Sequence, residues 1–282
     1  MVDPTAPGDS RDTARVDSLS YFFPAHNEAE NIEQLVAEAL AQLPVMAQRF
    51  EIIAVDDGST DGTGTIADRL AAEHPDVVRV VHHGANQGYG AALRSGLGAA
   101  RYPLVCFTDG DRQFRIADLA ALLDRIREPF DPASPALPDV VAGYRIKRAD
   151  PPIRLAYARV YRFCLRLFFG LHVRDVDCAC KLFRREALAD IRLTSGGAFL
   201  SAELLIKLRA LRRTVVEVGV PHHPRTAGRA SGADPRVVGR AVRDFWRLRL
   251  LLWARPREAL TIGEPALRPF DDTDTQAGAP PA

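Results

Sequence analysis

Two aspartates separated by one glycine, Asp109-Gly110-Asp111, form the pattern in this chain that points most directly to chemistry. They come directly after residues 104–108, an apolar run that predicts a buried strand. Carboxylate oxygens are ligands that Mg²⁺ prefers, and such a cation usually also binds the phosphates of a substrate. An ordinary acidic turn would have the same tripeptide. The metal interpretation is favoured because a second acidic loop precedes this one in the chain.

The second acidic loop runs from Asp56 to Thr63 and follows another short apolar run, residues 50–55. Its serine, threonine and aspartate residues are good helix caps. Its first aspartate is also suited to accept a hydrogen bond from a nucleobase or a ribose, and one loop can serve both purposes. A third segment, residues 84–90, is rich in glycine and could bring backbone close to a ligand.

Apolar runs with strand character alternate with segments of helical periodicity, such as residues 29–43. This alternation predicts parallel strands joined by helices, a fold in which ligands bind beyond the carboxyl ends of the strands. The loops that begin at Pro24, Asp56 and Asp109 should therefore meet at one edge of the sheet. The expected strands are residues 18–23, 50–55, 77–81, 104–108, 139–143, 182–183 and 215–220.

Length and composition narrow the class of protein. The 282 residues suffice for one sizeable core, and the formal net charge of +1 provides no overall field that would attract nucleic acid. Arginine dominates after about residue 145, so we expect an anionic partner for the second half of the chain. Cys178 and Cys180 lack a second pair of zinc ligands, and no disulfide framework is visible.

Targeting signals are not apparent. The first residues lack the apolar segment of a signal peptide, and no uninterrupted apolar run reaches the roughly 18–20 residues of a membrane span. We therefore expect a cytoplasmic location.

Four motifs occur in order in the first half of the chain: Pro24-Ala25-His26-Asn27-Glu28, residues 55–63, Asn86-Gln87-Gly88-Tyr89-Gly90, and Asp109-Gly110-Asp111-Arg112-Gln113. Together they resemble the family 2 inverting glycosyltransferases, and within them the dolichyl- or polyprenyl-phosphate sugar synthases. Residues 143–145, 180–184 and 225–231 support that branch. The resemblance covers about residues 18–235. It implies the GT-A fold, a Rossmann-like, mostly parallel α/β sheet flanked by helices in a single domain.

The resemblance also implies a role for each matching position. The residues that would line the nucleoside pocket are Pro24, Ala25 and Glu28, with Asp56 on the base or ribose. Those that would hold Mg²⁺ or Mn²⁺ and the diphosphate are Asp109, Asp111 and Gln113. Those that would lie near the reacting phosphates are Arg145, Arg225, Arg229 and Ser231. The implied catalytic residues are Asp111, Arg145, Arg225 and Glu203, the last on a helix near the acceptor.

One departure from the family bears on the acceptor. The family often has a second acidic residue just before the position of Glu203, where this chain has Ser201-Ala202. A hydroxyl acceptor needs a base to take its proton. A phosphate monoester, whose second pKa is about 6, is already largely dianionic at neutral pH and instead needs cations. Arginines suit that task, because a guanidinium can donate two parallel hydrogen bonds.

We therefore expect transfer from a nucleotide-sugar donor, such as GDP-mannose or a UDP-hexose, to a polyprenyl phosphate. Two other functions remain open on the sequence. One is a family 2 glycosyltransferase that acts on a hydroxyl group of a glycan or natural product. The other is a catalytically silent nucleotide-sugar-binding protein, against which the intact Asp109, Asp111 and Arg225 argue.

Two segments of the second half have arginines on one helical side and apolar residues on the other. The arginines are Arg154, Arg159, Arg162 and Arg166 in the first segment and Arg236, Arg240, Arg243 and Arg247 in the second. Such helices can lie in the interface of an anionic membrane, but the pattern also fits a solvated arginine face over a core-packed helix. The expected organisation is a tail over 1–17, the catalytic domain over 18–235, a basic amphipathic helix over 236–260 and a tail over 261–282.

Overall fold

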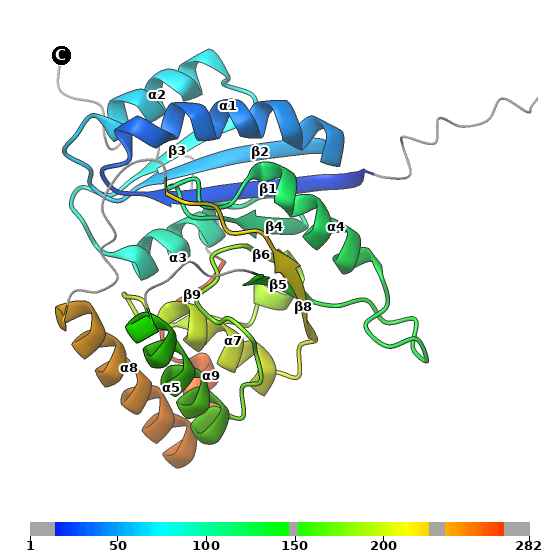
Figure 1. Cartoon of the computed structure of the whole chain (residues 1–282), viewed down its shortest axis with the longest axis vertical. Helices are drawn as coiled ribbons and strands as arrows, with labels where there is room; N and C mark the ends of the chain where they lie inside the picture. The colour runs from blue at the N-terminus through cyan, green and yellow to red at the C-terminus, as the bar shows by residue number, and fades with distance from the viewer. Residues whose placement is uncertain (1–14, 147–151, 226–234, 268–282) are drawn as a thin grey trace, which may run out of the picture.

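The computed structural model describes residues 15–146, 152–225 and 235–267. Its centre is a seven-stranded sheet in the order β3-β2-β1-β4-β6-β5-β8 (Figure 1). Neighbouring strands are parallel except at β6, which runs antiparallel to β4 and β5. The mostly parallel α/β sheet is thus confirmed. Its strands are β1 Val16–Ala25, β2 Ala47–Asp56, β3 Val78–His82, β4 Leu104–Phe107, β5 Val140–Arg145, β6 Lys181–Arg184 and β8 Val215–Val220.

Helices pack around this sheet, with α1 and α2 on one side of β1–β3 and α3 on the other (Figure 1). The helices are α1 Ala29–Met46, α2 Thr63–Glu73, α3 Tyr89–Ala99, α4 Leu119–Arg127, α5 Pro152–Phe169, α6 Arg185–Leu188, α7 Leu200–Ala210, α8 Pro235–Ala254 and α9 Pro256–Thr261, with a 3₁₀ turn, η1, at Ile116–Asp118. None of the described helices combines the length and the apolar character that crossing a bilayer requires.

The core forms where the apolar patterns meet. Helix α1 buries the side that its spacing indicates, including Ile32, Leu35 and Val36. Burying one such side chain contributes about 1.5–3 kcal/mol. Within the sheet, the Phe107 ring of β4 stacks on Phe22 of β1, at 5.2 Å between ring centroids. This contact ties together the two strands that carry the first and fourth motifs.

The topology gathers the polar loops at one edge. Strands β1, β2 and β4 are mutually parallel, so the loops after Pro24, Asp56 and Phe107 lie together, as expected. Strand β5 has the same direction as β4, because both are antiparallel to the intervening β6. Phe107, at the end of β4, is level with Ala142 of β5, because both pair with Lys181. Two strand spacings of about 4.8 Å separate them, and β5 runs three residues further, to Arg145.

Three boundaries of the expected division into tails, catalytic domain and C-terminal helix differ in the structure. Strand β1 begins at Val16, inside the expected N-terminal tail. The single helix expected over 236–260 is two helices, because Pro256 lacks a backbone N–H and the preceding Arg255 is not helical, at φ −146°. The tail expected from residue 261 instead begins with ordered backbone: β9, Glu264–Pro265, pairs with β7, Arg192–Leu193.

Candidate active site

The loop of Asp109-Gly110-Asp111 follows β4 and lies against the end of β1. A Cβ atom at Gly110 would come within 2.7 Å of the Pro24 carbonyl oxygen, so only glycine fits here without a backbone shift. Arg112 adopts φ 59°, which is uncommon outside glycine. Its guanidinium contacts Gln34 and Glu38 on α1, and these contacts hold the turn. The loop is therefore positioned jointly by β1 and α1.

The two carboxylates of this loop have different partners. Asp109 is partly buried, and its Oδ1 accepts a hydrogen bond from the Tyr89 hydroxyl at 2.9 Å. Asp111 is buried; its Oδ1 accepts from the Gln113 N–H at 3.1 Å, and its Oδ2 lies 2.6 Å from Nη2 of Arg225. Burial and the charge of Asp111 raise the pKa of Asp109. Two acidic groups placed in this way favour a cation beside them.

The residues present fit a divalent cation that takes its other ligands from substrate and water. Across the described ranges, no group of three or more His, Cys, Asp or Glu side chains could hold a metal alone. Mg²⁺ needs no such group, since it is commonly bound by one or two carboxylates plus substrate phosphates. The Gln113 amide, expected as a third ligand, donates to the His223 carbonyl oxygen at 3.3 Å. Its ligand role stays a prediction.

Asp56 ends β2 and is held by two neighbours. Its Oδ1 accepts the Ser59 N–H at 3.0 Å, and its Oδ2 lies 3.1 Å from Nδ1 of His82. Burial opposes ionisation of Asp56, but the bonds from His82 and Ser59 outweigh it and lower its pKa. The same contact with Asp56, together with Asp68 at 2.8 Å from Nε2, raises the pKa of His82 to about 9. Asp56 is therefore an ionised acceptor at neutral pH, as contact with a base or ribose requires.

The first motif interlocks with the loop after β2. Pro24 and Ala25 are the last residues of β1, and Asn27 turns the chain at φ 57°. The Asn27 Oδ1 accepts the Thr60 N–H at 2.9 Å, and the Glu28 N–H donates to the Thr63 hydroxyl at 2.9 Å. These bonds fix two sides of the expected nucleoside pocket. The ligand contacts of Pro24, Ala25 and Glu28 stay predictions.

The glycine-rich segment packs closely against another part of the chain, residues 196–197. A Cβ atom at Gly90 would lie 2.7 Å from the Gly196 carbonyl carbon, and one at Gly88 would lie 3.0 Å from its oxygen. Asp57 holds the segment from the other side, accepting the N–H groups of Gln87 and Gly88 at 2.9 and 2.8 Å. The close backbone approach that we expected toward a ligand thus serves, at these two glycines, to pack the start of α3 against residues 196–197.

Glu203 is enclosed near the start of α7. Its Oε1 accepts from the Thr194 N–H and hydroxyl at 2.9 and 2.8 Å, and its Oε2 accepts from the Ser195 N–H at 2.8 Å. Lys207 lies 2.9 Å away, and neither charged side chain is exposed. Burial opposes ionisation, but Lys207 and Ser195 lower the pKa of Glu203 on balance. This geometry favours an anchor for residues 194–195 over a base that reaches an acceptor.

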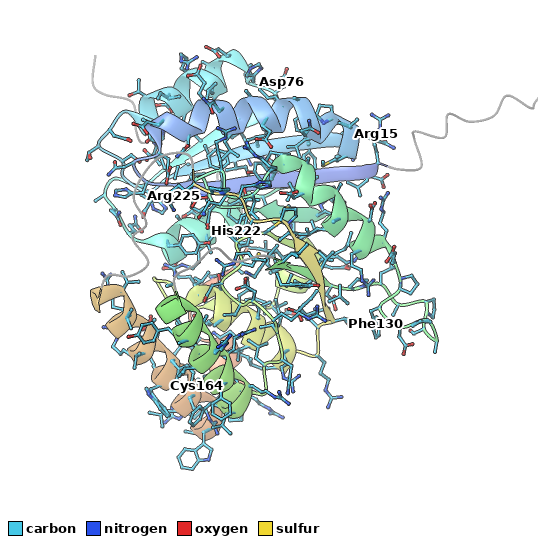
Figure 2. All side chains as sticks on the ribbon, viewed as in Figure 1. Arg15, Asp76, Phe130, Cys164, His222 and Arg225 are labelled. Carbon is cyan, nitrogen blue, oxygen red and sulfur yellow. The ribbon has the colours of Figure 1, made fainter. Side chains whose placement is uncertain are left out.

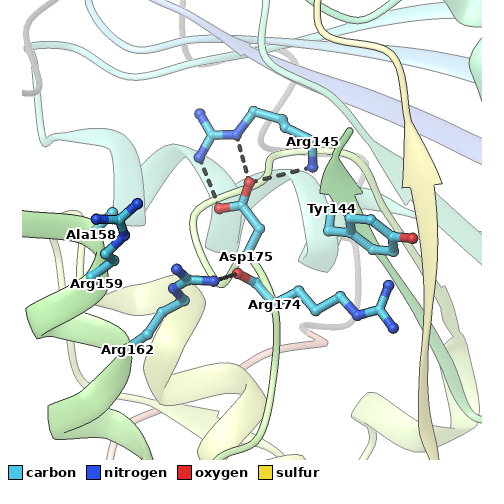
Figure 3. A pocket seen from close by; sticks show the side chains of 7 residues that line it. All are labelled: Tyr144, Arg145, Ala158, Arg159, Arg162, Arg174 and Asp175. Atoms are coloured by element: carbon cyan, nitrogen blue, oxygen red, sulfur yellow. Dashed lines mark hydrogen bonds and ion pairs between the residues drawn. The ribbon is translucent and has the colours of Figure 1, made fainter. Parts of the chain in front are cut away.

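A pocket of about 290 Å³ lies beyond the end of β5 (Figure 3). Its lining residues come from β5, α5 and the loop before β6: Tyr144, Arg145, Ala158, Arg159, Arg162, Arg174 and Asp175. Arg145 donates to both oxygens of Asp175, at 2.6 and 2.8 Å. The Arg174 guanidinium lies over the Tyr144 ring, 4.6 Å from its centroid. Four arginines against one carboxylate make this a pocket for an anion.

The segment after β8 returns to the Asp109–Asp111 loop. The His223 N–H donates to the Gln113 carbonyl oxygen at 2.9 Å, and Arg225 reaches Asp111 close to β1 (Figure 2). Arg229 and Ser231, also expected near the phosphates, lie outside the described residues.

Comparison with known proteins assigns this chain to a family. The model of glycosyl transferase family 2 matches residues 20–192, more than half of the chain. The chain belongs to glycosyl transferase family 2. This family 2 glycosyltransferase is 33% identical to glycosyltransferase AglD of Haloferax volcanii, over 80% of the chain and 36% of AglD. It is 31% identical to the polyprenol monophosphomannose synthase of Mycolicibacterium smegmatis, over 76% of the chain and 82% of that protein.

A solved structure confirms the GT-A fold of this glycosyltransferase. Glucosyl-3-phosphoglycerate synthase from Mycobacterium tuberculosis, crystallised with Mn²⁺, UDP and glucosyl-3-phosphoglycerate, superposes with a TM-score of 0.61 at 21% identity. The match covers 86% of this chain and 81% of that one. In contrast, the chain spans only about a third of the length of AglD.

Sequence reasoning missed several residues of the candidate site. Tyr89 lies within a recognised motif, but nothing in its spacing shows that its hydroxyl meets Asp109. Arg174 and Asp175 lie on a loop without periodicity, so no signal marked them. Arg159 and Arg162 were noticed only as part of an amphipathic helix, and the structure places both on the pocket.

Proposed function

We propose that this family 2 enzyme transfers a sugar from a nucleoside-diphosphate sugar to a polyprenyl phosphate. The observation that carries the proposal is the arginine pocket at the end of β5, two strands across the sheet from the Asp109–Asp111 loop at the end of β4. A donor diphosphate beside the Asp109–Asp111 loop and an acceptor phosphate in the arginine pocket would leave room for a sugar ring between them.

At the donor end, Asp56 would accept from the base or ribose, and Asp109 and Asp111 would hold Mg²⁺ or Mn²⁺. A bound divalent cation supplies charge neutralisation for the departing diphosphate. Support for this assignment is that the glucosyl-3-phosphoglycerate synthase of similar fold was crystallised with Mn²⁺ and UDP. Arg225, which now pairs with Asp111, lies within reach of the same diphosphate.

At the acceptor end, the pocket would hold the phosphate of the lipid through Arg145, Arg159 and Arg162. One phosphate oxygen attacks the anomeric carbon, the bond from that carbon to the donor diphosphate breaks, and the diphosphate leaves with the electron pair. No proton must be removed, because the acceptor is already largely dianionic at neutral pH. This agrees with an enclosed Glu203, and it favours a phosphate over a hydroxyl acceptor. One relative, the polyprenol monophosphomannose synthase, is named for the synthesis of a sugar-bearing polyprenol phosphate.

A lipid acceptor also calls for a membrane contact, and two helices offer one. Helices α5 and α8 pack side by side, with the Phe168 ring 5.7 Å from Phe245 and 5.1 Å from Trp246. Their exposed apolar side chains are Tyr157, Val160, Phe163 and Leu167 on α5 and Val238, Val242, Trp246, Leu250 and Trp253 on α8. The arginines exposed on the same helices are Arg159, Arg162, Arg166, Arg240, Arg243 and Arg247.

Apolar side chains mixed with arginines suit the surface of an anionic bilayer. We therefore include in the proposal a peripheral contact of α5 and α8 with the cytosolic membrane face. Because α5 also lines the arginine pocket, the polyprenyl chain could stay in the bilayer while its phosphate enters the pocket.

The proposal is tested by following nucleoside diphosphate release from a panel of UDP- and GDP-sugars with Mn²⁺. We expect one donor class to give release that requires a short-chain polyprenyl phosphate and that produces a sugar-bearing lipid phosphate. No release with any donor and metal would instead support a silent nucleotide-sugar-binding protein.

A further inference from the structure

Tyr89 is a residue of the glycine-rich segment for which the proposed function has no use. It is the first residue of α3, and its hydroxyl donates to Oδ1 of Asp109 at 2.9 Å, across 20 positions of sequence. Among the described residues, the other oxygen of Asp109, Oδ2, has no hydrogen bond or ion pair. The hydroxyl thus leaves one defined carboxylate oxygen available.

The backbone around Tyr89 is clamped on both sides. On one side, the Gly88 N–H donates to Asp57 at 2.8 Å. On the other, Gly90 lies so close to Gly196 that a Cβ atom would come within 2.7 Å of its carbonyl carbon. The tyrosine cannot shift along α3 without breaking one of these contacts.

The second side of the clamp is itself fixed from the core. The Ser195 N–H donates to Glu203, and the Ser195 carbonyl oxygen accepts from Arg94 at 2.5 Å. Glu203 is in turn held by Lys207, with both side chains fully enclosed. A continuous set of contacts therefore runs from α7, through residues 195–197, to the hydroxyl that orients Asp109.

We propose that Tyr89 is a positioning residue for the metal site: it holds Asp109 in the orientation that presents Oδ2 to the divalent cation of the donor complex. This inference rests on the proposed function for the existence of that cation. Groups that orient metal ligands are commonly worth about 10–100-fold in metal affinity. Asp111 needs no such partner, because the Gln113 N–H already fixes its Oδ1.

The test compares the affinity of the full chain for UDP and for GDP, each with and without Mn²⁺, by isothermal titration calorimetry. For each nucleotide, the metal ratio is the dissociation constant without Mn²⁺ divided by that with Mn²⁺, and it measures how much the metal strengthens binding. For Tyr89→Phe, which removes only the hydroxyl, we expect this ratio to fall by about 10–100-fold, with nucleotide binding in EDTA unchanged.

The matched control is Tyr21→Phe. Tyr21 is a buried tyrosine whose hydroxyl bonds Thr108 at 2.7 Å, one residue before Asp109, without touching the carboxylate. We expect Tyr21→Phe to change the midpoint of thermal unfolding but to keep the wild-type metal ratio. An unchanged metal ratio in folded Tyr89→Phe would overturn the positioning role alone. If the wild-type protein bound UDP and GDP equally well with and without Mn²⁺, the metal-assisted donor site would be overturned as well.

Discussion

The guanidinium of Arg225 lies against the carboxylate of Asp111, with Nη2 2.6 Å from Oδ2, although 114 positions separate the two residues in sequence. Asp111 is buried, and this contact occupies the oxygen that its bond from the Gln113 N–H leaves free. The arginine therefore stands where a cation would otherwise neutralise Asp111. Metal and donor diphosphate should bind together, because the diphosphate gives Arg225 an anionic partner other than Asp111.

The first prediction concerns Arg225. Arg225→Ala should bind Mn²⁺ more tightly than wild type in the absence of nucleotide, since the competing charge is gone. The same variant should lose transfer by about 10²–10³-fold while keeping much of its donor affinity, because a group that stabilises developing charge is missing. Arg225→Lys should recover only part of the transfer activity, since lysine restores the charge but not the planar guanidinium that can donate two parallel hydrogen bonds.

Arg115→Ala is the control for Arg225→Ala. Arg115 pairs with Glu38, at 3.5 Å, rather than with Asp111. It should leave both Mn²⁺ binding and transfer near wild type. Equal Mn²⁺ affinities for wild type and Arg225→Ala would show that the arginine does not compete with the metal.

The second prediction concerns Asp111. Asp111→Ala should abolish turnover with the fold intact by circular dichroism, because the leaving diphosphate loses metal stabilisation worth several kcal/mol. Nucleoside diphosphate release is the measurement. Wild-type turnover of this variant in EDTA would contradict a metal-dependent mechanism.

The third prediction concerns His82 and pH. Its pKa is raised from 6.5 to about 9 by Asp56 and Asp68, so its stabilising charge is fully present below pH 6.5 and is lost as pH rises through 9. The urea midpoint of wild type should therefore exceed that of His82→Gln at pH 6, and the gap should close by pH 9.5. Because 38% of the side chain is exposed, the difference in unfolding free energy at pH 6 should be that of a surface ion pair, about 0.2–1 kcal/mol. A gap that does not vary with pH would mean that His82 is uncharged throughout.

The fourth prediction concerns the membrane. The chain should cosediment with anionic vesicles, less so as salt screens the attraction. Charge reversal at Arg240 and Arg243, or replacement of the exposed Trp246 and Trp253 by serine, should weaken it further. Val45→Ser, which removes an exposed apolar side chain on α1, should not weaken it. Equal binding to neutral and anionic vesicles at low salt, or none to either, would leave α5 and α8 as packing elements.

The sequence predicted the secondary structure and the position of the loops better than it predicted contacts between residues. Periodicity located the strands of the seven-stranded sheet and the meeting of the loops that begin at Pro24, Asp56 and Asp109, because alternating elements force parallel crossovers. It could not show that β6 is antiparallel, since the short apolar run around Leu182 and Phe183 has no intrinsic direction. Gly90 shows a different limit: a glycine needed for close approach looks the same whether the neighbour is a ligand or, as here, Gly196.

The site itself depends on long-range pairs that no local pattern encodes. Tyr89 with Asp109 and Arg225 with Asp111 arise from the tertiary fold, and so does the assembly of the arginine pocket. Glu203 was expected near the acceptor from its motif, whereas its hydrogen bonds to residues 194–195 are visible only in three dimensions.

The central claim is that the acceptor is a phosphate held by arginines, and one comparison tests it most directly. The full chain is given its nucleotide-sugar donor and Mn²⁺, with either a short-chain polyprenyl phosphate or the matching polyprenol. We predict transfer to the phosphate and none to the alcohol. We also predict a large loss of transfer to the phosphate in Arg159→Ala, which removes one arginine from the pocket of Figure 3 and leaves Asp109 and Asp111 unchanged. Faster transfer to the alcohol than to its phosphate would contradict the account and establish a hydroxyl acceptor in its place.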